Sequence, residues 1–343
     1  MPREKVSVLG MDKVAVLGAG AWGTALARLL SEQSRVGLWT WQQEHAQALF
    51  GDRENRAFLP GYALSENVEP SADLALAVSG ARLVVLAVPS DAVRATLAAA
   101  AGALAPDATL VIVAKGIEPT TLMLLSEVTR DVLGPAAEQQ TVFLSGPSFA
   151  LEVARGLPTN LVAAGLDPER SRLVQSRFAS DRLRVYSSDD PAGVQVGGAL
   201  KNVIAIAAGA SDGLGFGHNT RAALITRGLA EMARLAVAKG GNVLTLSGLA
   251  GLGDLVLTCS AELSRNRTVG FELGRGRRLD EVLSGLGHVA EGVTTANSAH
   301  HLAERLGVDL PITSEVYAVL YAGKPVAQAV RDLLARPLKK ESE

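Results

Sequence analysis

One lysine in the second half of the chain lies where proton-transfer chemistry is expected. Lys201 is the single charged residue of an apolar, glycine-opened stretch at 197–206, which has the period of a helix. Burial in such surroundings disfavours the charged form of a lysine and lowers its pKa from about 10.4 towards the range used in general acid–base catalysis. A structural lysine that is ion-paired or that reaches solvent is the alternative.

Further charged residues follow at two positions. Asp254 comes after the glycine-rich turn at 248–253 and before an apolar helical segment, so it either orients Lys201 or serves as a helix N-cap. The run at 264–267 reads Ser-Arg-Asn-Arg. Arginines hold phosphate through paired hydrogen bonds, so this run is a candidate phosphate site, and a solvated charge cluster is the alternative.

The first part of the chain carries a dinucleotide signature. Residues 18–23 read G-A-G-A-W-G, which fits G-x-G-x-x-G directly after an apolar run and at the start of a helical stretch towards Leu30. Gly18 permits the tight turn, Gly20 lets the backbone approach a pyrophosphate, and Gly23 lets the helix pack on the strand. The helix N-terminus faces the phosphates. An ordinary turn is the weaker reading in this context.

The end of the second strand leaves the choice of cofactor open. An enzyme strict for NAD usually places a carboxylate there for the ribose 2′-hydroxyl, but none precedes Glu44. No arginine that could clamp a 2′-phosphate precedes Arg53 either. Both NAD(H) and NADP(H) are therefore retained as cofactors. Trp41 is placed to stack on an adenine, or else is a surface tryptophan.

Two loops after neighbouring predicted strands supply further candidates. Lys115 follows the strand that ends at 113, and the Ser-Gly-Pro-Ser run at 145–148 follows the next strand, with Gly146 and Ser148 in its turn. Ligands of open α/β sheets bind at the carboxyl ends of strands, so these loops are expected at one edge. A solvated lysine and a simple turn are the alternatives.

The elements that must position these residues change character along the chain. Apolar runs at 14–17, 35–39, 83–88, 109–113 and 141–144 alternate with alanine-rich stretches and predict an α/β domain, a Rossmann-type doubly wound parallel sheet. After Pro191 the runs at 194–238, 280–305 and 314–334 have helical period, which predicts a mostly α-helical domain. The expected domains are 11–192 and 193–337, joined by a long helix and a tight cleft.

Composition bounds the function. With 48% hydrophobic residues, 20% charged residues and a net charge of -2, the chain is globular and lacks a polybasic surface for nucleic acid. The single cysteine, Cys259, cannot form an internal disulfide, which favours a cytoplasmic location. Arg82 and Lys201 interrupt the longest apolar runs, so no membrane span is expected. One cysteine and five histidines without ligand spacing argue against zinc or another metal.

The two ends are expected to lie outside the domains. Residues 6–10 read VSVLG, a near copy of VAVLG at 14–18, and polar residues precede them. We interpret 1–10 as a dispensable extension and 338–343 as a polar tail.

Taken together and in order, the motifs closely resemble the bacterial NAD(P)-dependent glycerol-3-phosphate dehydrogenases from Met11 to about Ala335. The segments that carry the resemblance are GAGAWGTALA at 18–27, VPS at 88–90, AKG at 114–116, SGPSFA at 145–150, GGALKNVIAIAAGASDGLGFGHNTRAALITRGLAEM at 197–232, AGLGDLVLTC at 250–259 and SRNR at 264–267. The resemblance implies reversible hydride transfer that reduces dihydroxyacetone phosphate to sn-glycerol 3-phosphate and feeds glycerophospholipid synthesis.

The resemblance also implies roles for individual residues. Lys201 is the proton acceptor and forms the predicted catalytic group with Asp254 and Lys115. Cofactor contacts are implied at Gly18, Gly20, Ala21, Trp22, Gly23, Lys115, Ala150, Arg265, Val289 and Glu291. Substrate contacts are implied at Lys115, Gly146, Ser148, Lys201, Asp254, Ser264, Arg265 and Asn266, with Arg265 and Asn266 nearest the phosphate. The sequence departs from the family at Trp41 and Gln42, where a basic residue is common.

Two other functions remain open at this point. A different two-domain NAD(P)-dependent dehydrogenase, acting on a hydroxy acid or a sugar phosphate, would have the same architecture. A non-catalytic dinucleotide-binding regulator would keep the glycine loop but has no need of Lys201. The sequence leaves open whether the chain forms a homodimer.

Overall fold

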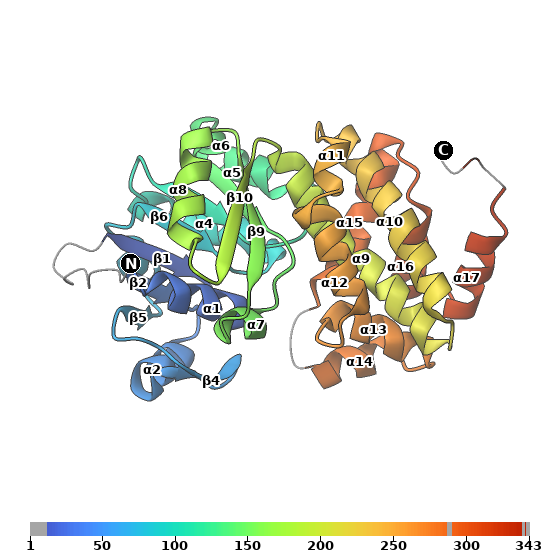
Figure 1. The fold of residues 1–343 in the computed structure, drawn as a ribbon, viewed down its shortest axis with the longest axis horizontal. Helices are drawn as coiled ribbons and strands as arrows, with labels where there is room; N and C mark the ends of the chain where they lie inside the picture. The colour runs from blue at the N-terminus through green and yellow to red at the C-terminus, as the bar shows by residue number, and fades with distance from the viewer. Residues whose placement is uncertain (1–11, 287–289, 338–339, 341–343) are drawn as a thin grey trace. The chain divides into compact units, whose positions relative to one another are not determined.

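The computed structural model describes residues 12–286, 290–337 and 340. The chain divides into two compact units, each described here by itself. The N-terminal unit comprises Met1–Lys115 and Met123–Val194, and the C-terminal unit comprises Gly116–Leu122 and Gln195–Glu343. Figure 1 shows the first unit mainly in blue to green and the second in yellow to red. The extension expected at 1–10 lies outside the described residues, as does the tail at 338–343 apart from Lys340.

The N-terminal unit is built on an eight-stranded sheet in the order β10-β9-β8-β7-β6-β1-β2-β5. All five predicted strands are present, at β1 (Lys13–Leu17), β2 (Arg35–Trp39), β6 (Leu83–Leu86), β7 (Thr109–Ile112) and β8 (Thr141–Ser145). They pair in parallel, and β6, β7 and β8 are buried along their whole length. The winding reverses at β1, which lies between β2 and β6. The predicted Rossmann-type fold is therefore confirmed.

The sheet is wider than the apolar runs predict, and it is mixed. β5 (Val68–Ser71) extends one edge in parallel, while β9 (Thr159–Gly165) pairs antiparallel with β8 and in parallel with β10 (Leu183–Ser188). A separate hairpin joins β3 (Glu54–Asn55) to β4 (Leu59–Ala63). The edge strands β5 and β10 are half exposed and partly polar, so a search for continuous apolar runs misses them.

Helices form two mutually packed groups around this sheet. One contains α1 (Ala21–Leu30), α7 (Ala150–Ala154) and α8 (Pro168–Phe178), and the other α3 (Leu74–Val78), α4 (Val93–Ala100), α5 (Leu125–Leu133) and α6 (Ala136–Gln140). α2 (Gln43–Asp52) packs on β5. The apolar face of α1 joins the strands in one buried core, through Leu26 and Leu30. This packing fixes the N-terminus of α1 at the end of β1.

The C-terminal unit is mostly helical, as predicted, and its described residues contain no strand. Its elements are α9 (Pro191–Gly213), α10 (His218–Ala238), α11 (Val243–Leu246), a π-helical turn (Leu249–Gly253), α12 (Asp254–Ser260), α13 (Arg265–Gly274), α14 (Leu279–Leu286), α15 (Glu291–Leu306), α16 (Pro311–Tyr321) and α17 (Val326–Leu334). α9 begins in the N-terminal unit and continues into this one. Because it begins at Pro191, Gly197 and Gly198 lie inside the helix, and the expectation that glycines open it is wrong.

α9 is the longest helix among the described residues, with 23 residues. Among the described residues it is long and apolar enough, by length and composition, to cross a membrane, so the expectation that Lys201 rules out such a segment is wrong. However, 89% of its most apolar 18-residue window is buried inside the structure. α13 packs against it backbone to backbone, since a Cβ on Gly270 would lie 1.9 Å from the Ile206 carbonyl oxygen. The helix is built as a protein core element.

Candidate active site

The glycine loop has the shape that a dinucleotide needs. Gly18 adopts φ +115°, and a Cβ there would lie 2.6 Å from the Ala87 carbonyl oxygen. A Cβ on Gly23 would lie 1.8 Å from the Gly18 carbonyl oxygen, so both positions require glycine. At Gly20, by contrast, no heavy atom lies within 4 Å of the Cβ position. The loop is closed where strand and helix meet and open where a pyrophosphate would approach.

The first turn of α1 completes this anion site. Gly20 is its N-cap and has no side chain to cap the helix, and the first turn contains no acidic residue. The first backbone N–H groups of a helix, here those of Ala21, Trp22 and Gly23, have no partner within the helix and attract an anion. The Trp22 side chain packs against the hydrophobic core. These residues fit a dinucleotide through their backbone.

A buried asparagine holds the loop in place, and sequence reasoning missed it. Asn55 is 1% exposed, and its Nδ2 donates to the Ala19 carbonyl oxygen at 2.8 Å and to Thr24 Oγ1 at 2.7 Å. Its Oδ1 accepts from the Phe58 N–H and is 3.2 Å from His45 Nε2. No local pattern reveals this role, because Asn55 lies 36 residues from Ala19 in the chain.

The end of β2 offers no free cation among the described residues nearby. Arg53 donates from Nη2 to the carbonyl oxygens of Ser65 and Val68, so its guanidinium is held by the backbone. Trp41 is 76% exposed. Its stacking on an adenine therefore stays a prediction.

Lys115 and the loop after β8 lie close together, because they follow β7 and β8, which are neighbouring parallel strands. Lys115 Nζ donates to the Gly146 carbonyl oxygen at 3.1 Å, and Ser148 Oγ donates to the same oxygen at 3.0 Å. Gly146 adopts φ +131°, which favours glycine. Ala150 is the first residue of the following helix, α7. The structure therefore brings these predicted residues to one edge of the sheet.

In the C-terminal unit Lys201 and Asp254 form a buried ion pair. Lys201 is 7% exposed and Asp254 0%, and the Lys201 ammonium donates to Asp254 Oδ1 and, at 3.0 Å, to Thr258 Oγ1. The N-cap of α12 is Gly253, so the alternative reading of Asp254 as a cap is excluded. We call Lys201, Asp254 and Thr258 the lysine centre. Thr258 was missed, although it lies one helical turn after Asp254 on the same face.

Glycines allow the lysine centre to form. A Cβ on Gly197 of α9 would lie 2.6 Å from the Ala250 carbonyl oxygen, and one on Gly251 would lie 2.1 Å from the Leu246 carbonyl oxygen. Gly197 lets the π-helical turn approach α9 closely, and Gly251 lets the same turn pack against the end of α11. Because Asp254 immediately follows that turn, its carboxylate reaches the lysine one turn further along α9.

Three of the four side chains in the segment 264–267 form hydrogen bonds within the protein. Ser264 caps α13 by accepting from the Arg267 N–H, and Asn266 Nδ2 donates to Asn202 Oδ1 at 2.9 Å. Asn266 Oδ1 accepts from the Gly292 N–H at 3.0 Å, so Glu291, the preceding residue, lies close to the start of α13. Arg265 is exposed and makes no hydrogen bond or ion pair within the described chain. Asn202 was missed, although it directly follows Lys201.

One predicted contact cannot be placed, because Val289 lies outside the described residues. Within the parts that the structure does describe, no three His, Cys, Asp or Glu side chains are grouped to hold a metal ion. Cys259 is fully buried beside the lysine centre, and this burial raises its pKa to about 12, opposed by the nearby Lys201 charge. The thiol therefore stays neutral and supplies no thiolate nucleophile.

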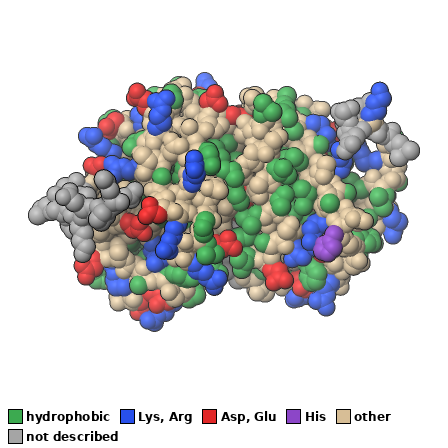
Figure 2. All heavy atoms as spheres, in the orientation of Figure 1, with side chains coloured by type: hydrophobic (Ala, Val, Ile, Leu, Met, Phe, Trp, Pro, Cys, Tyr) green, Lys and Arg blue, Asp and Glu red, His purple; other side chains and the backbone are tan. Residues whose placement is uncertain are grey.

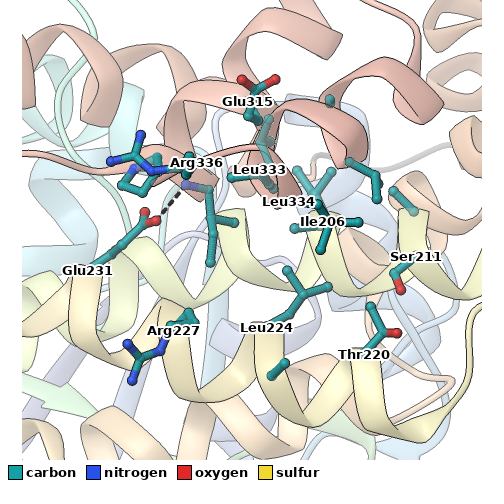
Figure 3. Close-up of a pocket in the computed structure, with 18 of the residues that line it drawn as sticks. Ile206, Ser211, Thr220, Leu224, Arg227, Glu231, Glu315, Leu333, Leu334 and Arg336 are labelled. Atoms are coloured by element: carbon teal, nitrogen blue, oxygen red, sulfur yellow. Dashed lines mark hydrogen bonds between the residues drawn. The ribbon is translucent and has the colours of Figure 1, made fainter. Parts of the chain in front are cut away.

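A cavity of about 770 Å³ lies elsewhere in the C-terminal unit, lined by residues of α9, α10, α16 and α17 (Figure 3). Its lining includes Glu231, which accepts from the N–H groups of Ile312 and Thr313 and so caps α16. Burial raises the pKa of Glu231 to about 7. None of the predicted site residues lines this cavity, so the candidate chemistry does not depend on it.

Hydride transfer to or from a dinucleotide needs a pyrophosphate-binding loop and a group that moves the accompanying proton. This chain has the first in its N-terminal unit and a candidate for the second in its C-terminal unit. A Rossmann-type sheet followed by a helical unit of this kind defines the two-domain NAD(P)-dependent dehydrogenases.

Comparison with known proteins identifies the family within that class. Residues 13–171 match the model of the NAD-dependent glycerol-3-phosphate dehydrogenase N-terminus, and residues 190–331 match that of its C-terminus. The chain belongs to the NAD-dependent glycerol-3-phosphate dehydrogenase family. It is an NAD(P)-dependent oxidoreductase that reduces dihydroxyacetone phosphate to glycerol 3-phosphate, and the alternative of a non-catalytic regulator is set aside.

Individual relatives agree over nearly the whole length. The chain is 52% identical over 331 residues to a protein of Geobacter metallireducens named glycerol-3-phosphate dehydrogenase (NAD(P)+), and the match covers 96% of this chain and 99% of the relative. A protein of the same name from Trichlorobacter lovleyi is 51% identical, with the same coverage. The crystal structure of glycerol-3-phosphate dehydrogenase from Coxiella burnetii is 38% identical, with a TM-score of 0.91 and coverage of 95% and 99%.

Proposed function

We propose that Lys201 moves the proton in this reaction. The observation that carries the proposal is the burial of its ammonium against Asp254 and Thr258, in a stretch of α9 (197–206) that holds no other charged residue. In the reductive direction the ammonium donates a proton to the C2 carbonyl oxygen and stabilises the negative charge that develops there. In the oxidative direction the neutral amine accepts the proton of the C2 hydroxyl, so one residue serves both directions.

Asp254 and Thr258 orient the lysine in this proposal. A buried ammonium without a counter-charge is costly, and the Asp254 carboxylate compensates for that cost. Thr258 Oγ1 donates to the Asp254 carbonyl oxygen at 2.6 Å, so its lone pair is left to accept from Lys201. The Nζ of Lys201 is therefore held in one position, which is the condition for efficient proton transfer.

The substrate phosphate is assigned to Arg265 and Asn266. Arg265 has a guanidinium without a protein partner in the described chain, and such a group matches the two oxygens of a phosphate. An amide carries two N–H donors, and the hydrogen bonds of Asn266 use one of them. Ser264, as the α13 cap, presents the start of the helix beside them. Gly146, Ser148 and Lys115 are the further substrate contacts of the proposal.

The cofactor is assigned to the glycine loop and its neighbours. When bound, the nicotinamide ring supplies or accepts the hydride. Gly18, Gly20, Ala21, Trp22 and Gly23 bind the pyrophosphate through backbone N–H groups. Lys115, Ala150, Arg265, Val289 and Glu291 are proposed as further contacts, and Trp41 as an adenine contact. Because the end of β2 carries neither a carboxylate before Glu44 nor a free cation nearby, we propose that both NAD(H) and NADP(H) are accepted.

The assay that tests these assignments follows the absorbance of reduced nicotinamide with purified protein. Dihydroxyacetone phosphate is offered with NADH and with NADPH, and unphosphorylated dihydroxyacetone is the matched control substrate. We expect oxidation of both cofactors and a strong preference for the phosphorylated ketone. Equal turnover of the two ketones would contradict the assignment of the substrate phosphate to Arg265 and Asn266. Oxidation of only one of the two cofactors would contradict the proposal that both are accepted.

We further propose a cytoplasmic homodimer that supplies glycerol 3-phosphate for glycerophospholipid synthesis. The one cysteine, Cys259, is buried and unpaired, so stability does not depend on an oxidising compartment. Hydrophobic side chains gather on the face of the C-terminal unit that carries α11 and α12 (Figure 2), and Leu244 there is 77% exposed and Val243 50%. Exposed apolar patches mark association surfaces. Light scattering on the purified protein tests the dimer, and a monomeric mass at micromolar concentration would contradict it.

A further inference from the structure

The C-terminal unit holds a second buried charge cluster, separate from the lysine centre. Asp212, near the end of α9, has a side chain that is only 6% exposed. Its Oδ1 accepts from Arg221 Nε at 3.1 Å and Nη2 at 2.8 Å, and its Oδ2 accepts from Arg267 Nε at 3.0 Å and Nη2 at 2.8 Å. One carboxylate thus binds two guanidinium groups, each through two hydrogen bonds. We call these three residues the Asp212 cluster.

The Asp212 cluster joins three helices at their ends. Asp212 belongs to the last turn of α9, Arg221 to the first turn of α10, and Arg267 to the first turn of α13. Paired hydrogen bonds between arginine and carboxylate fix direction as well as distance. Because all three side chains are mostly buried, this geometry is little weakened by solvent.

The first turn of α13 is therefore fixed to α9 at two separate points. Asn266 is bonded to Asn202, and the next residue, Arg267, is bonded to Asp212. Asn202 and Asp212 are about 15 Å apart along α9, given the helical rise of about 1.5 Å per residue. Close backbone contact lies between them, since a Cβ on Gly209 would lie 2.0 Å from the Arg267 carbonyl oxygen. Two anchors on either side of a close contact prevent α13 from rotating or sliding on α9.

Arg265 is the residue that this arrangement leaves available. Its neighbours in the 264–267 segment are engaged by the helix cap, by Asn202 and by Asp212, whereas its own guanidinium has no partner among the described residues. A ligand group that must be held within a fraction of an ångström needs supporting residues that fix its backbone. The cluster also carries an excess of positive charge, which favours a phosphate near the start of α13.

We propose that Asp212, Arg221 and Arg267 are positioning residues for substrate phosphate recognition, which they support by fixing the first turn of α13 on the helix that carries Lys201. They do not touch the substrate themselves. The inference rests on the proposed assignment of the phosphate to Arg265 and Asn266, and it adds that the specificity for a phosphorylated substrate depends on an ion cluster behind that site.

The test measures KM, kcat and inhibition by inorganic phosphate in Asp212→Asn and Arg267→Lys. In Asp212→Asn the amide nitrogen cannot accept from one of the two arginines, and in Arg267→Lys the ammonium lacks the planar pair of donors of a guanidinium, so Arg265 is held less precisely in both. For both variants we expect the KM for dihydroxyacetone phosphate and the inhibition constant for inorganic phosphate to rise about tenfold, with kcat within about threefold of the parent. Turnover of unphosphorylated dihydroxyacetone stays unchanged, and the Kd for NADH changes less than the inhibition constant for phosphate, because Arg265 is only one of several proposed cofactor contacts. Arg221→Lys, which loosens α10 rather than α13, has a smaller effect.

The control is Asp309→Asn, which breaks the more exposed ion pair with Arg336 in the same unit and leaves all these constants unchanged. A purely structural cluster would instead lower the Tm of Asp212→Asn and Arg267→Lys without changing KM or the inhibition constant, and that result overturns the inference. If Asp212→Asn does not fold, Arg267→Lys alone decides between the two outcomes. Equal use of phosphorylated and unphosphorylated ketone by the parent enzyme overturns the phosphate assignment instead, so the two failures are distinguishable.

Discussion

In the glycine loop the groups available to a ligand are backbone N–H groups, whereas in the lysine centre they are charged side chains withdrawn from solvent. The loop depends on the absence of side chains at Gly18 and Gly23, where backbone atoms lie closer than any Cβ allows. The lysine centre depends on three specific polar groups in mutual contact. Substitutions in the first region should therefore act through steric exclusion of the cofactor, and substitutions in the second through lost charge and proton transfer.

The largest effect is expected for Lys201→Met. Methionine keeps the approximate length of the side chain and removes its charge. NADH binding should therefore survive, while kcat should fall by a factor of about 10²–10⁴. Steady-state rates with dihydroxyacetone phosphate and fluorescence titration with NADH measure the two quantities. Lys324→Met, which removes a lysine bound to Glu315 and Asp332, is the matched control with unchanged kcat. Turnover within a few fold of the parent, with the same pH profile, would show that the proton comes from another group.

Arg265→Lys should have the next largest effect. A lysine ammonium cannot form the two parallel hydrogen bonds of a guanidinium, so kcat/KM for the phosphorylated ketone should fall by roughly 2–4 kcal/mol of transition-state stabilisation. Arg277→Lys alters an exposed arginine paired with Glu272 and serves as the control. A variant that still distinguishes phosphorylated from unphosphorylated ketone as well as the parent does would contradict this assignment.

Gly20→Val tests the steric side of the comparison. The position has open space for a Cβ and an extended backbone, with φ −73° and ψ −176°, so valine should fold without strain. Its side chain would occupy the region expected for the pyrophosphate, and the Kd for NADH should rise by at least about tenfold. Gly102→Val, also at an open position, is the control. Unchanged NADH affinity in folded Gly20→Val would contradict the assignment of the glycine loop to the cofactor pyrophosphate.

Asn55→Ala should have the smallest of these effects. The substitution leaves the Ala19 carbonyl and the Thr24 hydroxyl without their partner, at a cost of about 1–3 kcal/mol, and loosens the loop. We expect a lower Tm together with a several-fold higher Kd for NADH, read by thermal unfolding and fluorescence titration. Asn67→Ala removes an asparagine bonded to the Ser31 carbonyl at the far end of α1, so it should lower Tm alone. Equal NADH affinity in both variants would reduce Asn55 to a stabilising residue.

Local sequence patterns were enough to predict the glycine loop and to single out Lys201, because each has a signature within a few residues. Gly18 to Gly23 lie between a strand and a helix, and Lys201 interrupts an apolar helical period. Asn55 has no such signature, since its partners lie on the glycine loop and α1. The same holds for Asp212, whose two arginines come from α10 and α13. Side chains that act across elements are specified by packing, which no short window contains.

By itself the sequence determined the positions of five buried strands along the chain, the change to helices after Pro191 and the candidate residues for the chemistry. These features follow from periodicity and residue type, which are local properties. Only the tertiary structure decided that β9 runs antiparallel to β8 and that Asp254 pairs with Lys201. It also decided that Arg267 is held by Asp212 while Arg265 remains available. Strand direction and ion pairing depend on which distant segments meet, and burial of those segments together is what selects them.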